Sequence, residues 1–376
     1  MSAKGLKVLV IGGGFSGMSA AIQLRKSGAA VDVVEIDPGW RSYGAGISLG
    51  GPTLRAFREL GILDAFLERG WASDGVELFT PNGHKLASIP TPRLAGPDVP
   101  GGGAIMRPTL AAILAEATRG AGANVKLGAS FTRLDQDGER AEAEFSDGSR
   151  GAYDLVIGAD GLYSTVREAI FPDAPKPRYV GQCVWRAVLP RPPEVQNAMM
   201  WLGAKVKAGL NPVSRDAMYM FVTEDRPNND RIEPSLFLGL LGDLIAPFTA
   251  PPMQFAKDRL GEDSHTVYRP LESLLLPRPW SKGRIVLIGD AAHATTPHLA
   301  SGACIGVEDA IVLAEELDRG ASVPAALAAF EERRWDRCRM VVENSGRLAE
   351  IEITGGDPAE AAKLMGGSMR ALAAPI

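Results

Sequence analysis

The sequence predicts an α/β protein: a Rossmann-like domain that is interrupted by an inserted, α+β-type antiparallel sheet and completed by C-terminal helices. Three observations predict it. A short apolar strand leads into the glycine-rich residues 12–17, GGGFSG, and then into a helix. Two later segments, residues 158–161 and 289–290, repeat the order of buried strand, glycine with aspartate, and helix. Between them, residues 179–269 alternate apolar and polar side chains as antiparallel strands do.

The composition narrows the class of protein. A chain of 376 residues, of which 45% are hydrophobic, can bury a core for two domains or for one domain with a large insertion. The net charge of −5 gives no basic surface for nucleic acid. No apolar run reaches the roughly 18 residues of a membrane span. The few cysteines and histidines show no zinc spacing, so we expect no metal and a reducing, cytoplasmic location.

Residues 12–17 have the spacing of a dinucleotide-binding turn, with a strand before them, a helix after them and Glu35 at the tip of the second strand. The first glycine makes the tight turn, the second lets a pyrophosphate approach the backbone, and the third lets helix and strand pack closely. An acid at the strand tip binds a ribose hydroxyl, which favours an NAD-like or FAD-like ligand over NADP. The alternative is a glycine-rich turn in an ordinary βαβ unit.

Arg107 stands at the start of the next strong amphipathic helix, which we expect over residues 109–117. The dipole at a helix start favours an acid, so an arginine there is not explained by the helix itself. Either Arg107 is solvated or it reaches a polar ligand.

The remaining segments set the expected domain boundaries. Residues 1–75, 101–178 and 271–354 belong to the nucleotide domain and its C-terminal helices, and residues 76–100 and 179–270 belong to the sheet. Within the sheet we expect strands that include residues 183–189, 217–223 and 235–240. Residues 355–376 are rich in alanine and glycine, and we expect a loose tail there.

The late segment around Asp290 is a second place where a ligand can approach. A buried strand, residues 285–288, ends at Gly289 and Asp290, and a helix of small residues begins near Gly302. The first turn of a helix offers free N–H groups and a positive dipole end. A carboxylate facing such a helix start indicates a polar ligand between them.

Taken together, residues 12–17 with Glu35, GADGLYSTVR at 158–167 and GDAAHATTP at 289–297 resemble the motifs of the single-component flavin monooxygenases that share the p-hydroxybenzoate hydroxylase fold. Within that family the chain is similar to salicylate-hydroxylase-like enzymes, and its PHLASGAC string is similar to that of 6-hydroxynicotinate 3-monooxygenase-like enzymes. It departs from the family at Ser48, where the hydroxynicotinate enzyme has a histidine, and at Cys304, where many relatives have asparagine.

The resemblance implies FAD as cofactor, with the pyrophosphate on the first glycines, the ribose on Glu35 and the flavin ring against Pro297 and the next helix start. The cofactor-binding residues it implies are Gly12, Gly14, Ser16, Gly17, Glu35, Ala45, Gly46, Arg107, Phe131, Asp160, Gly161, Gly289, Asp290, Pro297, Gly302, Ala303 and Cys304.

The reaction implied is hydroxylation of a small, activated aromatic or hydroxy-heteroaromatic substrate with NAD(P)H and O2, through a flavin C4a-hydroperoxide. Candidates for substrate contact are His298, Tyr219 and Arg186. Each also has a structural interpretation: a satisfied histidine, a core aromatic of the sheet and a salt bridge inside the fold. We expect a monomer or a homodimer.

Two other functions fit the same sequence. One is a flavin-dependent reductase or oxidase of the same fold, and the other is a non-catalytic, flavin-binding redox sensor. A flavin halogenase is disfavoured, because residues 183–186, CVWR, do not match the Trp-x-Trp-x-Ile-Pro motif of that class.

Overall fold

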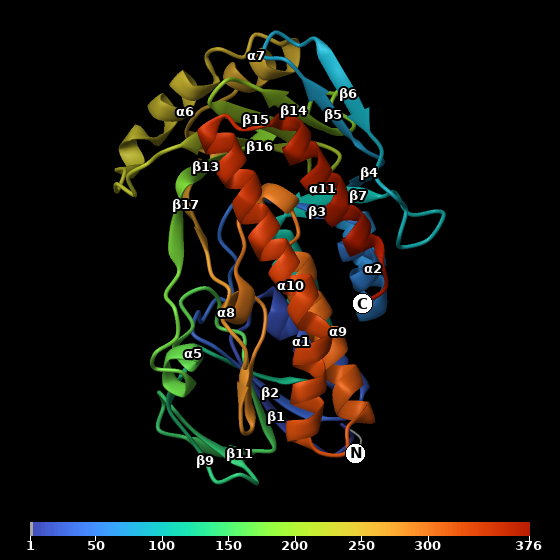
Figure 1. Cartoon of the computed structure of the whole chain (residues 1–376), viewed down its shortest axis with the longest axis vertical. Helices are drawn as coiled ribbons and strands as arrows, with labels where there is room; N and C mark the ends of the chain where they lie inside the picture. The colour runs from blue at the N-terminus through green and yellow to red at the C-terminus, as the bar shows by residue number, and fades with distance from the viewer. Residues whose placement is uncertain (1–2) are drawn as a thin grey trace.

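The computed structural model describes residues 3–376, which form two sheet-based parts connected by long helices (Figure 1). The lower part in that view is built on a six-stranded sheet in the order β18-β19-β12-β1-β2-β8. All neighbouring pairs in it are parallel except β18 with β19. The strands are β1 (Lys7–Ile11), β2 (Ala30–Glu35), β8 (Asn124–Leu127), β12 (Leu155–Gly158), β18 (Ser281–Lys282) and β19 (Ile285–Leu287).

The central strands of this sheet are apolar because they are covered on both faces, as parallel strands usually are. Every residue of β12 and β19 is buried. Helix α1 packs against α4 and α9, and the long helix α10 packs on α9. The helices of this part are α1 (Phe15–Lys26), α2 (Gly51–Leu60), α3 (Leu63–Arg69), α4 (Arg107–Gly120), α5 (Thr165–Ile170), α8 (Asp290–His293), α9 (Gly302–Arg319) and α10 (Val323–Thr354). Strands β9 (Phe131–Gln136), β10 (Ala141–Phe145) and β11 (Arg150–Tyr153) form a small sheet at the lower end (Figure 1).

The upper part is a seven-stranded sheet in the order β17-β13-β16-β15-β14-β5-β6, antiparallel except between β14 and β5. Helices α6 (Phe237–Ile245) and α7 (Pro251–Lys257) lie at its outer side (Figure 1), where Trp185 and Trp201 are fully buried. The strands are β5 (Val76–Phe79), β6 (Lys85–Ile89), β13 (Arg178–Pro190), β14 (Ala198–Leu202), β15 (Val206–Pro212), β16 (Ala217–Asp225) and β17 (Val267–Ser273). A small sheet of β3 (Gly46–Gly50), β7 (Gly102–Met106) and β4 (Trp71–Ser73) completes the fold.

The strand predicted over residues 235–240 is wrong. Residues Pro234–Leu236 form a 3-10 turn, and α6 follows it. Leu241 and Ile245, four residues apart, are the buried residues of α6 and pack on the outer face of the sheet. A short apolar run of this kind has no clear period, so the sequence alone did not separate a strand from a helix.

The loose tail predicted for residues 355–376 is also wrong. Residues Pro358–Ala373 form helix α11, with Asp357 as N-cap and Pro358 in the first turn. The Asp357 side chain accepts a hydrogen bond of 2.8 Å from the Ala359 N–H, and Leu372 is completely buried. An aspartate followed by proline is a helix-start signal, and it outweighs the two glycines inside the helix. None of the helices within residues 3–376 combines the length and the apolar character needed to cross a membrane.

Candidate active site

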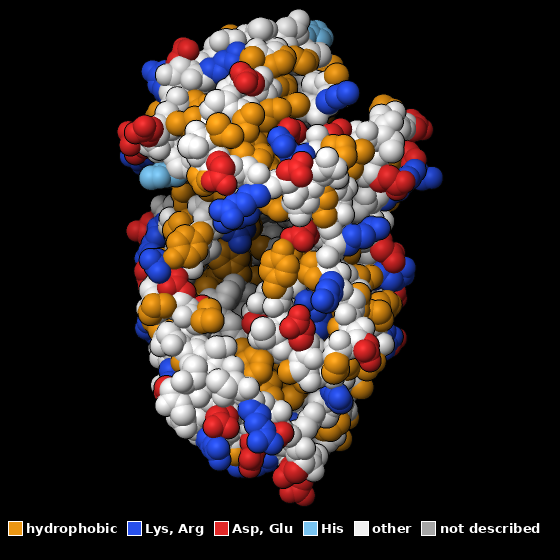
Figure 2. Space-filling view, turned by 90° about the vertical axis from the view of Figure 1, so that its left-hand side faces the viewer, with side chains coloured by type: hydrophobic (Ala, Val, Ile, Leu, Met, Phe, Trp, Pro, Cys, Tyr) orange, Lys and Arg blue, Asp and Glu red, His pale blue; other side chains and the backbone are white. Residues whose placement is uncertain are grey.

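A cavity of about 710 Å³ runs from the start of α1 to the inner face of the seven-stranded sheet. Figure 2 shows a deep hollow between the two parts of the molecule, with Lys or Arg side chains at its upper rim. The cavity is lined at one end by Gly13, Gly14 and Glu35, and at the other end by Ser48, Arg186 and Tyr219. Between these ends lie Arg107, Asp290 and the segment 294–304.

The glycines of the first turn each have the environment that their predicted roles require. A Cβ on Gly12, whose φ is +105°, would lie 2.4 Å from the Ala159 carbonyl oxygen, and a Cβ on Gly17 would lie 2.0 Å from the Gly12 oxygen. A Cβ on Gly14 would meet nothing within 4 Å, because this glycine faces open space. Gly14 is also the N-cap of α1 and has no side chain to occupy the free N–H groups. This corner therefore leaves room for an anionic group against a helix start.

Glu35 lies beside this corner. Its Oε2 accepts a hydrogen bond of 2.7 Å from the Gly13 N–H, and its Oε1 accepts one of 2.8 Å from the Asp37 N–H. The Trp40 indole donates to the Gly13 carbonyl at 2.8 Å. These bonds fix the Glu35 carboxylate at the cavity wall, where the remaining lone pairs can accept from a ribose hydroxyl.

Residues 158–161, the second segment in which a strand is followed by glycine and aspartate, mainly stabilise the fold and contribute less to the cavity. Asp160 does not line the cavity: its Oδ2 accepts hydrogen bonds of 2.8 Å and 3.0 Å from the Thr165 and Val166 N–H groups and so holds the start of α5. Gly161 does line the cavity. Phe131 lies on β9, packed against the core and outside the cavity wall, so we withdraw its assignment to the cofactor.

Asp290 faces the middle of the cavity. Its side chain forms no hydrogen bond or ion pair within the described part of the chain and is exposed to the open space of the cavity. Its depth inside the cavity still desolvates the carboxylate and raises the pKa of Asp290, and the charges of His293 and Arg107 offset this only in part. An unpartnered carboxylate in this position is suited to accept hydrogen bonds from ligand hydroxyl groups.

Gly289 and Ser16 pack against each other and so bring residues 289–290 next to the glycine-rich turn at residues 12–17. A Cβ on Gly289, whose φ is +59°, would lie 2.3 Å from Ser16 Oγ, so only glycine fits. The Gly289 N–H donates a hydrogen bond of 2.9 Å to Asp309 Oδ2, from α9. Ser16 lines the cavity, whereas Gly12, Gly17, Ala45 and Gly289 support the wall from behind.

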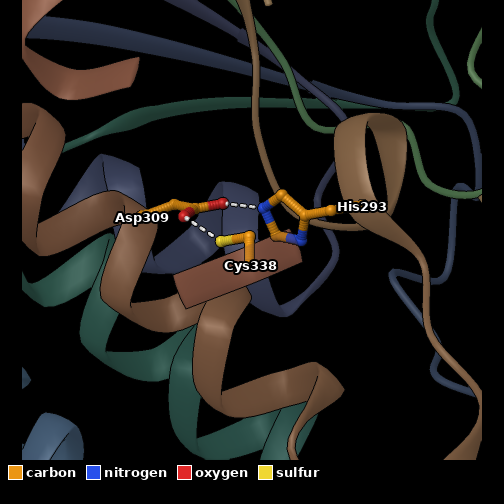
Figure 3. A group of neighbouring side chains, drawn as sticks. All are labelled: His293, Asp309 and Cys338. Atoms are coloured by element: carbon orange, nitrogen blue, oxygen red, sulfur yellow. Dashed lines mark hydrogen bonds and ion pairs between the residues drawn. The ribbon is translucent and has the colours of Figure 1, made fainter. Parts of the chain in front are cut away.

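Asp309 is a residue that the sequence analysis missed. Its Oδ2 also lies 2.6 Å from His293 Nε2, and its Oδ1 accepts a hydrogen bond from Arg334 Nε at 2.8 Å. Figure 3 shows Asp309 and His293 together with the neighbouring Cys338. Burial opposes both charges, but Asp309 raises the pKa of His293 well above its usual value, and His293 and Arg334 lower that of Asp309. These bonds occupy both carboxylate oxygens and tie α8, α9 and α10 together behind the cavity.

The start of α9 forms the opposite wall. Gly302, Ala303 and Cys304 line the cavity, and the Ser301 hydroxyl donates to the Leu299 carbonyl instead of capping the helix. The free N–H groups of this turn therefore face the cavity beside Pro297 and stabilise negative charge there. Burial raises the pKa of Cys304, so its thiol stays protonated.

The inner face of the large sheet supplies the far end of the cavity. Side chains alternate along β13 and β16, so Trp185 and Met218 point into the outer core while Arg186 and Tyr219 point into the cavity. The Tyr219 hydroxyl shares a 2.5 Å hydrogen bond with Ser48 Oγ. Burial raises the pKa of Tyr219 and lowers that of Arg186.

His298 lines the cavity next to Pro297, but both of its ring nitrogens face protein groups. Nδ1 lies 2.9 Å from Thr296 Oγ1, and Nε2 lies 3.3 Å from Glu352 Oε2 on α10. The contact with Glu352 was not predicted from the sequence. Met369 and Leu372 of α11, which line the cavity, were not predicted either. Nothing local marks these residues, since long-range packing brings them to the site.

These parts fit an elongated dinucleotide with an anionic middle. Gly14 leaves the space for a pyrophosphate, Glu35 and Asp290 accept from hydroxyl groups, and two helix starts stabilise negative charge. A continuous cavity between a Rossmann-type turn and a separate sheet defines a nucleotide-dependent oxidoreductase with its substrate end at the sheet.

Comparison with known proteins is consistent with that class. The chain matches the family model of the FAD binding domain over residues 5–345. It is 31% identical over 350 residues to the aurachin C monooxygenase/isomerase of Stigmatella aurantiaca, which covers 92% of this chain and 90% of that protein. It is 28% identical over 373 residues to the FAD-dependent urate hydroxylase of Klebsiella pneumoniae, covering 92% of this chain and 90% of that enzyme.

The structure of HpxO from Klebsiella pneumoniae in complex with FAD and uric acid superimposes with a TM-score of 0.83 at 25% identity, covering 98% of this chain and 92% of that one. The chain therefore belongs to the FAD-binding-domain family. It is an FAD-dependent monooxygenase of the single-component aromatic hydroxylase class.

Proposed function

We propose that the protein hydroxylates a small, anionic aromatic or hydroxy-heteroaromatic compound with NAD(P)H and O2. The observation that carries this proposal is Arg186, which faces the substrate end of the cavity and forms no ion pair with any carboxylate of residues 3–376. Burial lowers the pKa of Arg186, yet a guanidinium stays protonated in proteins. A buried charge without a partner is unfavourable, so an anionic substituent on the substrate is the group that would compensate it.

Arg107 faces the same cavity and forms no ion pair within residues 3–376, and its guanidinium lies 5.1 Å from the centre of the Phe15 ring. We assign Arg107 and Asp290 to the FAD side, because they lie between the two helix starts, and Arg186 to the substrate. When bound, FAD supplies the electron transfer from NAD(P)H and the activation of O2. The chain itself orients the substrate through Arg186, excludes water with the walls of the sheet and stabilises negative charge at the start of α9.

The test is a binding series on the FAD-loaded protein, with hydroxybenzoates, hydroxypyridine carboxylates and aminobenzoates against their methyl esters. Acids should perturb the flavin absorbance with a Kd about 10- to 100-fold lower than their esters, as expected for one charge-assisted hydrogen bond of about 1.5–3 kcal/mol. Arg186→Met should abolish this preference. Lys85→Met, which removes a surface pair with Glu77 outside the cavity lining, is the control and should keep it.

Equal affinity for acids and esters in the native protein would contradict the assignment of Arg186. Oxygen and NAD(P)H consumption on the bound compounds separates the other functions. A reductase consumes NAD(P)H without O2, and a redox sensor binds FAD without turning over any of them.

A further inference from the structure

We propose that Thr296, His298 and Glu352 form the acid–base relay that takes a proton from the substrate, an inference that rests on the hydroxylase function proposed above. An aromatic ring becomes a better nucleophile when its hydroxyl or amino group loses a proton, so the site needs a base or a relay. Thr296 and His298 line the cavity on either side of Pro297, and Glu352 approaches His298 from α10.

The geometry is that of a base held between a cavity hydroxyl and an orienting carboxylate. Thr296 Oγ1 lies 2.9 Å from His298 Nδ1, and His298 Nε2 approaches Glu352 Oε2 at 3.3 Å without a hydrogen bond to any group of residues 3–376. The His298 side chain is 1% exposed, whereas that of Glu352 is 34% exposed. The three groups therefore connect the cavity with the protein surface, in the order of hydroxyl, base and orienter that proton-transfer sites use.

The negative charge of Glu352 favours one tautomer of the His298 ring. A carboxylate only accepts, so the Nε2 that faces Glu352 carries the ring proton and Nδ1 is left to accept from the Thr296 hydroxyl. Burial lowers the pKa of His298, so the ring is neutral near pH 7 and free to take a proton. Burial alone would raise the pKa of Glu352, but the His298 ring and the Lys207 ammonium outweigh it and lower that pKa to about 2.

The proton balance follows from these positions. The substrate hydroxyl gives its proton to Thr296 Oγ1 as the proton of that hydroxyl passes to His298 Nδ1. The Glu352 carboxylate stays ionised and stabilises the resulting imidazolium, which carries protons on both ring nitrogens. The ring later returns its Nδ1 proton through Thr296 to the hydroxylated product, so that no electrons move, the protons balance, and the ring is again in its Nε2–H form.

Two other titratable side chains of the cavity, those of Tyr219 and Cys304, are poor bases, and the Asp290 carboxylate is assigned to FAD. Burial raises the pKa values of Tyr219 and Cys304, so both keep their protons near pH 7. The charged groups that act on His298 are Glu352 from α10, Lys207 from β15 and Asp225 from β16. Glu352 and Asp225 raise the pKa of His298 and Lys207 lowers it, which leaves the lowering by burial dominant.

The first test follows proton transfer without turnover. 3-Hydroxy-4-nitrobenzoate, a carboxylated phenol that becomes coloured on ionisation, is bound to the FAD-loaded protein and the pH is raised in a stopped-flow experiment. Thr296→Val keeps the shape but removes the hydroxyl, and His298→Gln removes the base. Each should slow phenolate formation on the order of 100-fold at unchanged probe affinity. Imidazole added to His298→Gly should restore the rate.

Glu352 is a positioning residue, so its variant has a different signature. Glu352→Gln should lower the pH midpoint of phenolate formation, because the carboxylate that raises the pKa of His298 is lost. Glu350→Gln is the control, since Glu350 lies on the same helix and pairs with Arg347 at the surface. Native rates in both Thr296→Val and His298→Gln would overturn the relay and leave the substrate assignment untouched.

The second test needs no substrate. In nitrogen NMR spectra of the protein labelled at histidine, His298 should be neutral at pH 7 and protonated on Nε2, and Glu352→Gln should change its tautomer. A cationic ring or an Nδ1–H tautomer in the native protein would overturn the relay. This holds even if the probe phenol fails to bind, an outcome that would count against the proposed substrate class alone.

Discussion

At the scale of single residues, Gly14 and Gly17 belong to the same turn but have different roles. The Gly17 Cα faces the Gly12 carbonyl so closely that a Cβ would lie 2.0 Å from its oxygen, whereas a Cβ on Gly14 would meet nothing within 4 Å. Gly17 is required by the fold itself. We propose that Gly14 is required by the ligand, because the open space at the helix start has room for a pyrophosphate.

Alanine substitutions should separate these two roles. Gly17→Ala forces backbone to move and should destabilise the protein by about 3 kcal/mol or more in urea unfolding. Gly14→Ala has an ordinary backbone conformation, with φ of −74°, and should cost about 1 kcal/mol or less. It should nonetheless weaken FAD binding at least tenfold by flavin-fluorescence titration. A Gly14→Ala protein with native FAD affinity would contradict the pyrophosphate assignment.

The residues that were predictable are those whose role follows from the backbone beside them. Gly12, Gly14, Gly17 and Asp290 were predicted because a turn or a strand end fixes where each one points. Glu352 was not, because a helix far along the chain brings it to His298.

At the scale of elements, α11 is held in place by the charges of other helices. The Arg55 guanidinium on α2 donates to the Ala373 and Ala374 carbonyls at 2.9 Å each, and Arg337 on α10 donates to Leu372 at 2.8 Å. Arg337 also pairs with the buried Glu308. The C-terminal carbonyls of a helix need donors, and cations there interact favourably with its dipole. This docking turns the expected tail into a wall of the cavity.

Removing the Arg55 side chain should destabilise the docking of α11 without affecting the other helices. Arg55→Ala should speed amide exchange in residues 358–373 by about tenfold, which corresponds to about 1.4 kcal/mol of local stability, while α1 and α9 stay protected. Arg69→Ala, which removes only an exposed pair with Glu116, is the matched control. Equal protection of α11 in native and Arg55→Ala protein would show that Arg55 does not hold the helix, which would leave that role to Arg337 and the packing of Leu372.

The elements that the sequence predicted well are buried along most of their length, as in the parallel strands and α9. The two failures, residues 235–240 and 355–376, belong to helices with few buried residues. The first is a short apolar run that suits either structure, and the second is held partly by Arg55 and Arg337 from distant helices. Interactions of this kind with distant elements leave no local pattern in a sequence.

At the scale of the whole molecule, the negative net charge contrasts with two cationic side chains that face the cavity, although the Glu35 and Asp290 carboxylates also lie there. The chain carries a formal net charge of −5, which taken alone repels anions. The cavity, in contrast, holds Arg107 and Arg186 without ion pairs among the described residues, and two helix starts face it. A charge inside a low-dielectric hollow is screened less than one at the surface, so the local field should govern the approach of an anionic ligand.

The salt dependence of FAD association tests which field dominates. If the cavity does, the association rate of FAD with the apoprotein should fall several-fold between low salt and about 0.5 M salt, because ions screen the attraction. If the net charge of −5 does, the same salt should speed association. Arg107→Met should flatten the decrease, whereas Lys85→Met at the surface should keep it. A rate that rises with salt in the native protein would mean that Arg107 does not speed the association of FAD. The cavity arginines would then stabilise FAD only after it has bound.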